Sequence, residues 1–250
     1  MISQIVAAVS AGIYVFRGIP VLQLKARMLV PTAKRTRRQL ALGIPVSLQF
    51  TITSIGSMIL QSAVNGFGAD VVAAFTAAGR AESITNIPMS NLAVAASTFV
   101  AQNYGAGQYR RILTTVRKVF VVDLGLSVLC SLVLFFGGEQ IVGLFMTDYN
   151  SQIVYAAKEY LFAISLCYSL VSVLFVLRNT LQGLGCTYAK CSGRCWRVNR
   201  QNLPFSYLFT PLFGFKAVCF AGPVAWLLAD LPLIVLYWRK AKQMRELSNQ

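Results

Sequence analysis

Long apolar segments separated by short basic loops constrain this chain more than any other feature. A helix needs about 20 mostly apolar residues to cross the hydrocarbon core of a bilayer. Seven segments approach or exceed that length, at residues 2–23, 40–66, 70–101, 116–137, 152–181, 187–210 and 217–238. They lack the period-two alternation of membrane β-strands and are too long for them. We therefore predict an all-α, polytopic membrane protein.

The composition agrees with this division of the chain. Hydrophobic residues make up 56% and charged residues 12%, with a mean hydropathy of +0.61. A soluble domain carries about 25% charged residues. The segments differ in how well they fit a membrane span. The segment 187–210 is poorly apolar, and 116–137 has a short apolar extension at 140–146. In 70–101, Pro88 predicts a kink.

Basic residues alternate between the two sides of the predicted membrane. Eighteen lie in the loops after the first, third, fifth and seventh segments, whereas the opposite loops hold only Lys216. Cytoplasmic loops are enriched in Lys and Arg. This predicts a cell-membrane protein with its N-terminus outside and its C-terminus in the cytoplasm. It also supports the sixth segment despite its weak hydropathy.

The charge and the missing residue types exclude several classes of function. A net charge of +15 is compatible with nucleic-acid binding, but the basic residues lie between apolar segments, so we expect lipid and no nucleic acid as a partner. The absence of histidine removes histidine-based catalysis and most zinc chemistry. The six cysteines match no common metal spacing. We expect no enzyme, no resident cofactor and no metal site.

Polar side chains recur at helical spacing in two successive segments. The segment 40–66 carries Thr53, Ser57, Gln61 and Asn65 on one face. The segment 70–101 carries Glu82, Asn86, Ser90 and Ser97 along another stripe. Polar groups in a membrane usually face a cavity or a neighbouring helix. The stripes predict a polar cleft between the two helices, and interhelical hydrogen bonding without a ligand is the alternative.

Three acidic residues fall well inside the predicted segments. Glu82 lies about four turns from the cytoplasmic end of its segment, so it is a candidate ion-linked carboxylate. Asp230 lies in mid-helix and is a further candidate. Asp123 follows Arg117 and Lys118 by about a turn, which favours an interfacial ion pair over a functional role.

Four sequence elements resemble one family of transporters. They are Gly43-Ile44-Pro45, the run Ser97–Gly107 that ends in Gln-Asn-Tyr-Gly-Ala-Gly, the run Leu177–Gly185 that contains Leu-Gln-Gly-Leu-Gly, and the run Pro223–Asp230. In this order and spacing they resemble the MATE (multidrug and toxic compound extrusion) transporters over about 230 residues. The glycine-containing elements are fairly specific to that family.

The resemblance implies a fold and a function. Family members have twelve helices in two six-helix lobes, and they export drugs or organic cations in exchange for sodium ions or protons. The seven segments resemble helix six plus the whole second lobe. We expect residues 1–39 to form the first helix and a basic cytoplasmic loop, 40–240 the six-helix lobe, and 241–250 a cytoplasmic tail. The expected partners are a small organic substrate and a missing N-terminal lobe, as in a truncated or misassigned reading frame.

Two departures from the family pattern stand out. Some sodium-coupled members have a carboxylate near the position of Thr53, and proton-coupled members use an aspartate in the first lobe; this chain has neither. Glu82 matches a second-lobe carboxylate of a common family pattern. Residues 189–202 read Ala-Lys-Cys-Ser-Gly-Arg-Cys-Trp-Arg-Val-Asn-Arg-Gln-Asn where the family has an apolar helix. A local frameshift within Lys190–Arg197 is our hypothesis for that stretch.

The leading functional prediction is a fragment of a cation-coupled antiporter for drugs or organic cations. The candidate cavity-lining or ion-linked residues are Glu82, Asn86, Gln61, Asn65, Asp230 and Asp123. The coupling ion implied by the resemblance is Na⁺ or H⁺. A lipid-linked sugar flippase of related architecture is one alternative, although intramembrane cations are few. A seven-helix membrane protein that transports nothing is the other. A lone half lacks a complete cleft, so we predict no transport without a partner half.

Overall fold

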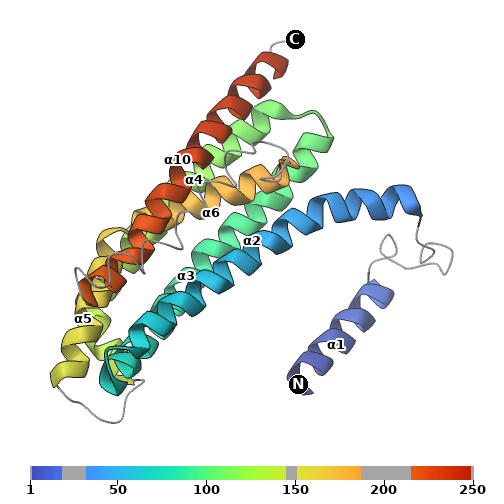
Figure 1. The fold of residues 1–250 in the computed structure, drawn as a ribbon. Coiled ribbons are helices and arrows are strands. Elements are labelled where there is room, and N and C mark those ends of the chain that lie inside the picture. The colour runs from blue at the N-terminus through green and yellow to red at the C-terminus, as the bar shows by residue number, and fades with distance from the viewer. Residues whose placement is uncertain (1, 19–31, 145–150, 187–214, 249–250) are drawn as a thin grey trace. The chain divides into compact units, whose positions relative to one another are not determined.

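The apolar segments fold into helices. Inside a bilayer no water is present to bond to the backbone, so its N–H and C=O groups must pair with one another, as they do in a helix. The computed structural model describes residues 2–18, 32–144, 151–186 and 215–248, and this part contains no strand. The helices are α1 (Ile2–Gly18), α2 (Ala33–Asn65), α3 (Ala69–Gly105), α4 (Tyr109–Leu144), α5 (Ser151–Leu166), α6 (Tyr168–Gly183) and α10 (Phe215–Ser248) (Figure 1). The predicted all-α membrane fold is confirmed. The predicted segment 187–210 and the proposed frameshift at 189–202 lie outside the described residues.

The chain divides into two units within α2, where Pro45 interrupts the backbone hydrogen-bond ladder. The first unit is Met1–Ile44, in which α1 has no buried residue. The second unit, Pro45–Gln250, contains the bundle. Among the described helices, α2, α4 and α10 are long and apolar enough to cross a membrane, and the bent pair α5–α6 would make a fourth span.

In the second unit, α6 lies among three other helices. It packs against α3, α4 and α10 (Figure 1). Its buried residues therefore point in several directions, from Tyr168 and Ser172 to Asn179 and Leu181. Around it, the largest apolar cluster joins α3, α4, α5 and α10 through small residues such as Ala78 and larger ones such as Met89 and Leu134.

Two predicted segments differ from the structure. The described part of the apolar extension, residues 140–144, is continuous with the segment before it, since α4 runs unbroken from Tyr109 to Leu144. The segment 152–181 was predicted as one helix, but α5 and α6 meet at a 53° bend at Cys167. At the bend, the Ser131 hydroxyl of α4 donates a 2.7 Å hydrogen bond to the Ser165 carbonyl. This bond satisfies a carbonyl at the break, as a bent membrane helix requires.

The two glycine motifs form matching helix ends. In both, the backbone N–H of the first residue after the helix donates to the carbonyl four residues before it. The next residue is a glycine in the left-handed conformation. The N–H of the third residue donates to the carbonyl five residues before it. The glycines are Gly107, at φ 71°, and Gly185, at φ 70°. This is the glycine-terminated ending known from many helices. The motifs therefore end α3 and α6.

Candidate functional site

A polar cluster lies where α3 faces the α5–α6 bend. The carboxylate of Glu82 accepts a 3.0 Å hydrogen bond from the Tyr160 hydroxyl of α5. One turn further along α3, Asn86 donates a 3.5 Å hydrogen bond to the same carboxylate. The Asn86 carbonyl oxygen in turn accepts a 3.0 Å bond from the Tyr168 hydroxyl of α6. Glu82 and Asn86 are thus tied to both sides of the bend.

Thr85 completes the cluster from the same face of α3. Its hydroxyl lies 2.6 Å from the Tyr168 hydroxyl and 2.9 Å from the Glu82 carbonyl. The Cys130 thiol of α4 donates to the Thr85 carbonyl at 3.6 Å. Four helices therefore contribute to one connected network. Networks of this kind fix side-chain positions in an apolar interior.

The cluster is buried on its aromatic side and partly open at its carboxylate. Tyr168 is 0% exposed and Tyr160 is 8% exposed, whereas Glu82 and Asn86 are half-buried. Phe75 packs edge-on against Tyr160, with ring centroids 4.7 Å apart. A carboxylate held by a phenol and an amide, with one side accessible, can take up a proton or meet a small cation. The described residues hold no group of three His, Cys, Asp or Glu side chains suited to a bound metal.

Gln61 and Asn65 lie apart from this network. Gln61 donates a 3.3 Å hydrogen bond to Asn65 on the same helix, and Thr53 and Ser57 bond back to carbonyls of α2. Among the described elements α2 does not pack closely along α3. The structure therefore brings Glu82 and Asn86 together but does not join the two stripes, and the cleft between them stays a prediction.

Asp123 is buried rather than interfacial, so the predicted ion pair with Arg117 or Lys118 is wrong. Asp123 is 0% exposed, whereas both basic side chains are exposed. Five or six residues along a helix place them on other faces than Asp123. Neither carboxylate oxygen has a hydrogen-bond partner within the described chain. The Ser172 hydroxyl of α6 lies near this carboxyl without a hydrogen bond of good geometry.

Asp230 is the second buried carboxyl outside the network. It is 3% exposed on α10, and both of its oxygens lack partners among the described residues. Leu233, one turn further along α10, packs against Leu177 and Leu181 of α6. Asp123 and Asp230 are thus held on α4 and α10, two helices that pack against α6, and the structure joins neither to Glu82.

The sequence pattern did not predict that Tyr160 and Tyr168 belong to the polar cluster. Aromatic residues in apolar segments usually belong to the core, so each one alone gives no functional signal. Tyr160 lies on α5 and Tyr168 on α6, and packing of these two helices against α3 brings their hydroxyls to Glu82 and Asn86.

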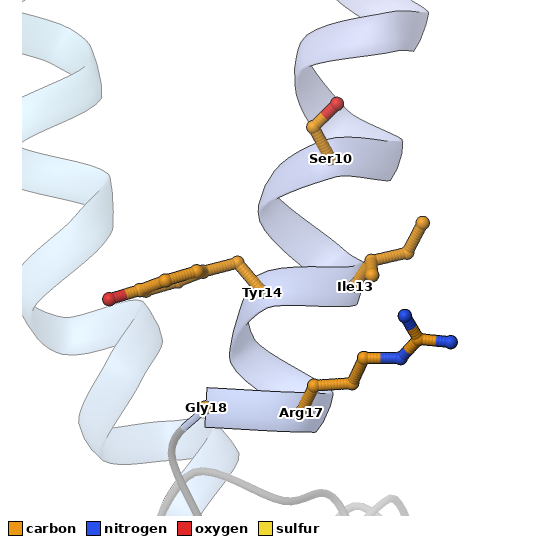
Figure 2. A pocket seen from close by; sticks show the side chains of 5 residues that line it. All are labelled: Ser10, Ile13, Tyr14, Arg17 and Gly18. Atoms are coloured by element: carbon orange, nitrogen blue, oxygen red, sulfur yellow. The ribbon is translucent and has the colours of Figure 1, made fainter.

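A separate hollow lies on α1. Ser10, Ile13, Tyr14, Arg17 and Gly18 line it. Figure 2 shows Tyr14 pointing away from Ile13 and Arg17. All five residues come from one helix, so the hollow is an open surface and not an enclosed binding site.

Comparison with known proteins identifies relatives of this chain. It is 25% identical over 211 residues to "Probable multidrug resistance protein YpnP" of Bacillus subtilis (strain 168), covering 83% of this chain and 47% of the relative. It is 24% identical to "Probable multidrug resistance protein NorM" of Thermotoga maritima, covering 94% of this chain and 51% of that protein. The chain therefore spans about half the length of these curated relatives.

The solved structures agree on the fold. An outward-facing multidrug resistance MATE family transporter superposes with a TM-score of 0.83 at 16% identity, covering 98% of this chain and 55% of the other. The relatives do not favour the lipid-linked sugar flippase alternative. The MatE family model matches residues 45–190. The chain thus belongs to the MatE family, the MATE transporters that its motifs resemble.

Proposed function

We propose that this chain acts as one lobe of a drug-efflux transporter that exchanges an organic cation for Na⁺ or H⁺. The observation that carries the proposal is the Glu82 network, because it holds a carboxylate of α3 against the bend of the candidate membrane span that α5 and α6 form. Ionisable groups at such positions commonly serve ion or substrate pathways. The names of the relatives, two multidrug resistance proteins, support drugs as the class of substrate.

In this proposal Glu82 binds the coupling ion, with Tyr160 and Asn86 as its positioning partners. Asn86 lines the substrate path, and Gln61 and Asn65 line it from α2. An ion shifts a conformational equilibrium only by as much as its affinities for the two states differ. Tyr160 and Tyr168 approach from opposite sides of the bend, so a state with another bend angle would offer Glu82 different hydrogen bonds. Asp123 and Asp230 are secondary candidates on α4 and α10.

The test is efflux of ethidium from cells that express this chain with and without the first lobe of a full-length relative. We expect efflux only when both halves are present, because the cleft lies between lobes. Efflux by this chain alone would contradict the half-transporter assignment.

A second comparison isolates the carboxylate. In the protein with both lobes present, Glu82→Gln should lower efflux at least about tenfold. A tenfold loss corresponds to about 1.4 kcal/mol of free energy of ion binding. Glu159→Gln, at a carboxylate paired with the exposed Lys216, is the matched control and should leave efflux unchanged. Equal efflux by the Glu82→Gln variant and the original protein would overturn the role of Glu82. Proteoliposomes with an imposed Na⁺ or pH gradient then identify the coupling ion.

A further inference from the structure

A shallow groove runs between α4 and α5, away from the Glu82 network. It consists of two adjoining hollows with volumes of about 200 and 300 Å³. Both are lined by Phe135, Phe136 and Phe162, which join them into one feature. The Phe135 ring contacts both others, with centroids 5.0 Å from Phe136 and 5.8 Å from Phe162.

The groove is charged at one end only. Lys158 and Glu139 line that end and form a 2.6 Å ion pair, with side chains 65% and 44% exposed. The other end reaches Ser165 and Ser169 at the helix bend. The Ser131 and Ser165 hydroxyls there bond to backbone carbonyls, so they offer little to a polar ligand. A ligand that fits must have a charged head and a long apolar tail.

The length of the groove matches one leaflet of a bilayer. Eleven positions separate Val128 from Glu139 along α4, which forms one wall of the groove. At the rise of a helix this is about 16 Å. Half of a hydrocarbon core is about 15 Å. A groove that starts at a charged pair and ends at this depth has the dimensions of a single acyl chain.

The charged end distinguishes among headgroups. The Lys158 ammonium has three N–H donors, and one of them donates to Glu139. The ammonium can therefore also donate to a phosphate oxygen. Glu139 would meet a cationic headgroup favourably and an anionic one unfavourably. Phosphatidylethanolamine carries both a phosphate and an ammonium, whereas phosphatidylglycerol carries the phosphate alone. The Lys–Glu pair therefore complements a zwitterionic headgroup.

We propose that the groove between α4 and α5 binds phosphatidylethanolamine, with the headgroup at Lys158–Glu139 and one acyl chain along the three phenylalanines. The site is independent of the Glu82 network and of the proposed transport. It would seat one lipid against the α5 side of the bend. The ring faces and the neighbouring aliphatic side chains supply the apolar contact.

The test is photo-cross-linking in nanodiscs that contain trace phosphatidylethanolamine with a photoreactive group at the end of an acyl chain. Mass spectrometry should locate the adducts near the inner end, within Val128–Leu132 and Ser165–Ser169. Competing unlabelled phosphatidylethanolamine should reduce them in a saturable way. Adducts spread evenly over the exposed apolar faces of α4 and α10, without saturation, would mean bulk lipid only and would overturn the site.

Two pairs of variants complete the test. Ser169→Trp fills the inner end from an exposed position and should lower labelling about fivefold, a change of about 1 kcal/mol; Val121→Trp, on an exposed face of α4 outside the groove, should not. Lys158→Ala should lower labelling, whereas Lys216→Ala, which removes an exposed lysine paired with Glu159 outside the groove, should not. Circular dichroism should show each variant folded. Equal labelling of Ser169→Trp and the original chain would overturn the groove, and equal labelling by phosphatidylglycerol would overturn the headgroup assignment.

Discussion

Gly183 of α6 lies against the backbone of Ser97 of α3 so closely that a Cβ atom at Gly183 would stand 2.5 Å from the Ser97 carbonyl oxygen. The neighbouring atom belongs to a helix backbone, so it cannot rotate away. We expect Gly183→Ala to destabilise the protein by about 1–3 kcal/mol, the usual cost of overpacking. Thermal unfolding in detergent micelles measures this. Gly125→Ala, where a Cβ meets open space, is the control, and an equal effect of the two variants would contradict the close contact.

Removing the Tyr168 hydroxyl should weaken the junction of α3 and α6. Tyr168→Phe removes the hydroxyl that donates to the Asn86 carbonyl oxygen and that lies 2.6 Å from the Thr85 hydroxyl, which keeps its bond to the Glu82 carbonyl. Hydrogen bonds in membranes are modest, so we expect a loss of about 1 kcal/mol. Tyr155→Phe, at a tyrosine that is 65% exposed, should change little. Unfolding of both variants under the same conditions tests the difference, and an unchanged midpoint for Tyr168→Phe would show that the network adds no stability.

Replacing Asp123 by leucine should stabilise the isolated chain. The carboxyl is buried with no hydrogen-bond partner among the described residues, and leucine has the same branched shape. Apolar replacement of a buried ionic group of matching shape is often neutral or favourable by about 1–4 kcal/mol. Glu246→Leu, on an exposed face, controls for the loss of one negative charge. A lower unfolding midpoint for Asp123→Leu than for the original chain would show that Asp123 contributes a favourable interaction.

The Ser131 hydroxyl should matter because it supports the bend. Ser131→Ala removes the donor to the Ser165 carbonyl, which leaves a polar group in an apolar environment. We expect a loss of about 1–3 kcal/mol. Thr114→Ala in the same helix removes an exposed hydroxyl that bonds only to its own helix and should cost less. Spin labels on α5 and α6 would also report a change in the 53° angle; unchanged stability and angle would contradict the supporting role.

Local chemistry explains which features were predictable. Apolar length predicts the helices, and Gly107 and Gly185 predict helix ends because only glycine adopts that backbone conformation readily. The pairing of Glu82 with Asn86 follows from their spacing of four residues. The bend at Cys167 was not predictable in this way, because neither proline nor glycine stands there. It depends on Ser131, which is distant in sequence.

The same limit explains the errors at the candidate residues. Asp123 was assigned to the interface from its neighbours in sequence, but helix rotation turns it inward, where Ser172 of α6 lies near it. Gln61 and Asn65 share a face, as predicted, yet their nearest polar partners are each other. Tyr160 and Tyr168 belong to the site because α5 and α6 pack against α3, and their sequence positions alone do not predict that packing. Sequence spacing places residues on faces, and only packing determines what each face meets.

The bend at Cys167 gives the Glu82 cluster a mechanical property. Tyr160 lies on the arm before the bend and Tyr168 on the arm after it, and their hydroxyls contact Glu82 and Asn86 on one rigid helix. Any rotation of one arm about Cys167 must lengthen one of these contacts relative to the other. The angle between α5 and α6 therefore determines which hydrogen bonds Glu82 and Asn86 can keep. A movement of the α5 arm and a change in the polar surroundings of the Glu82 carboxylate occur together.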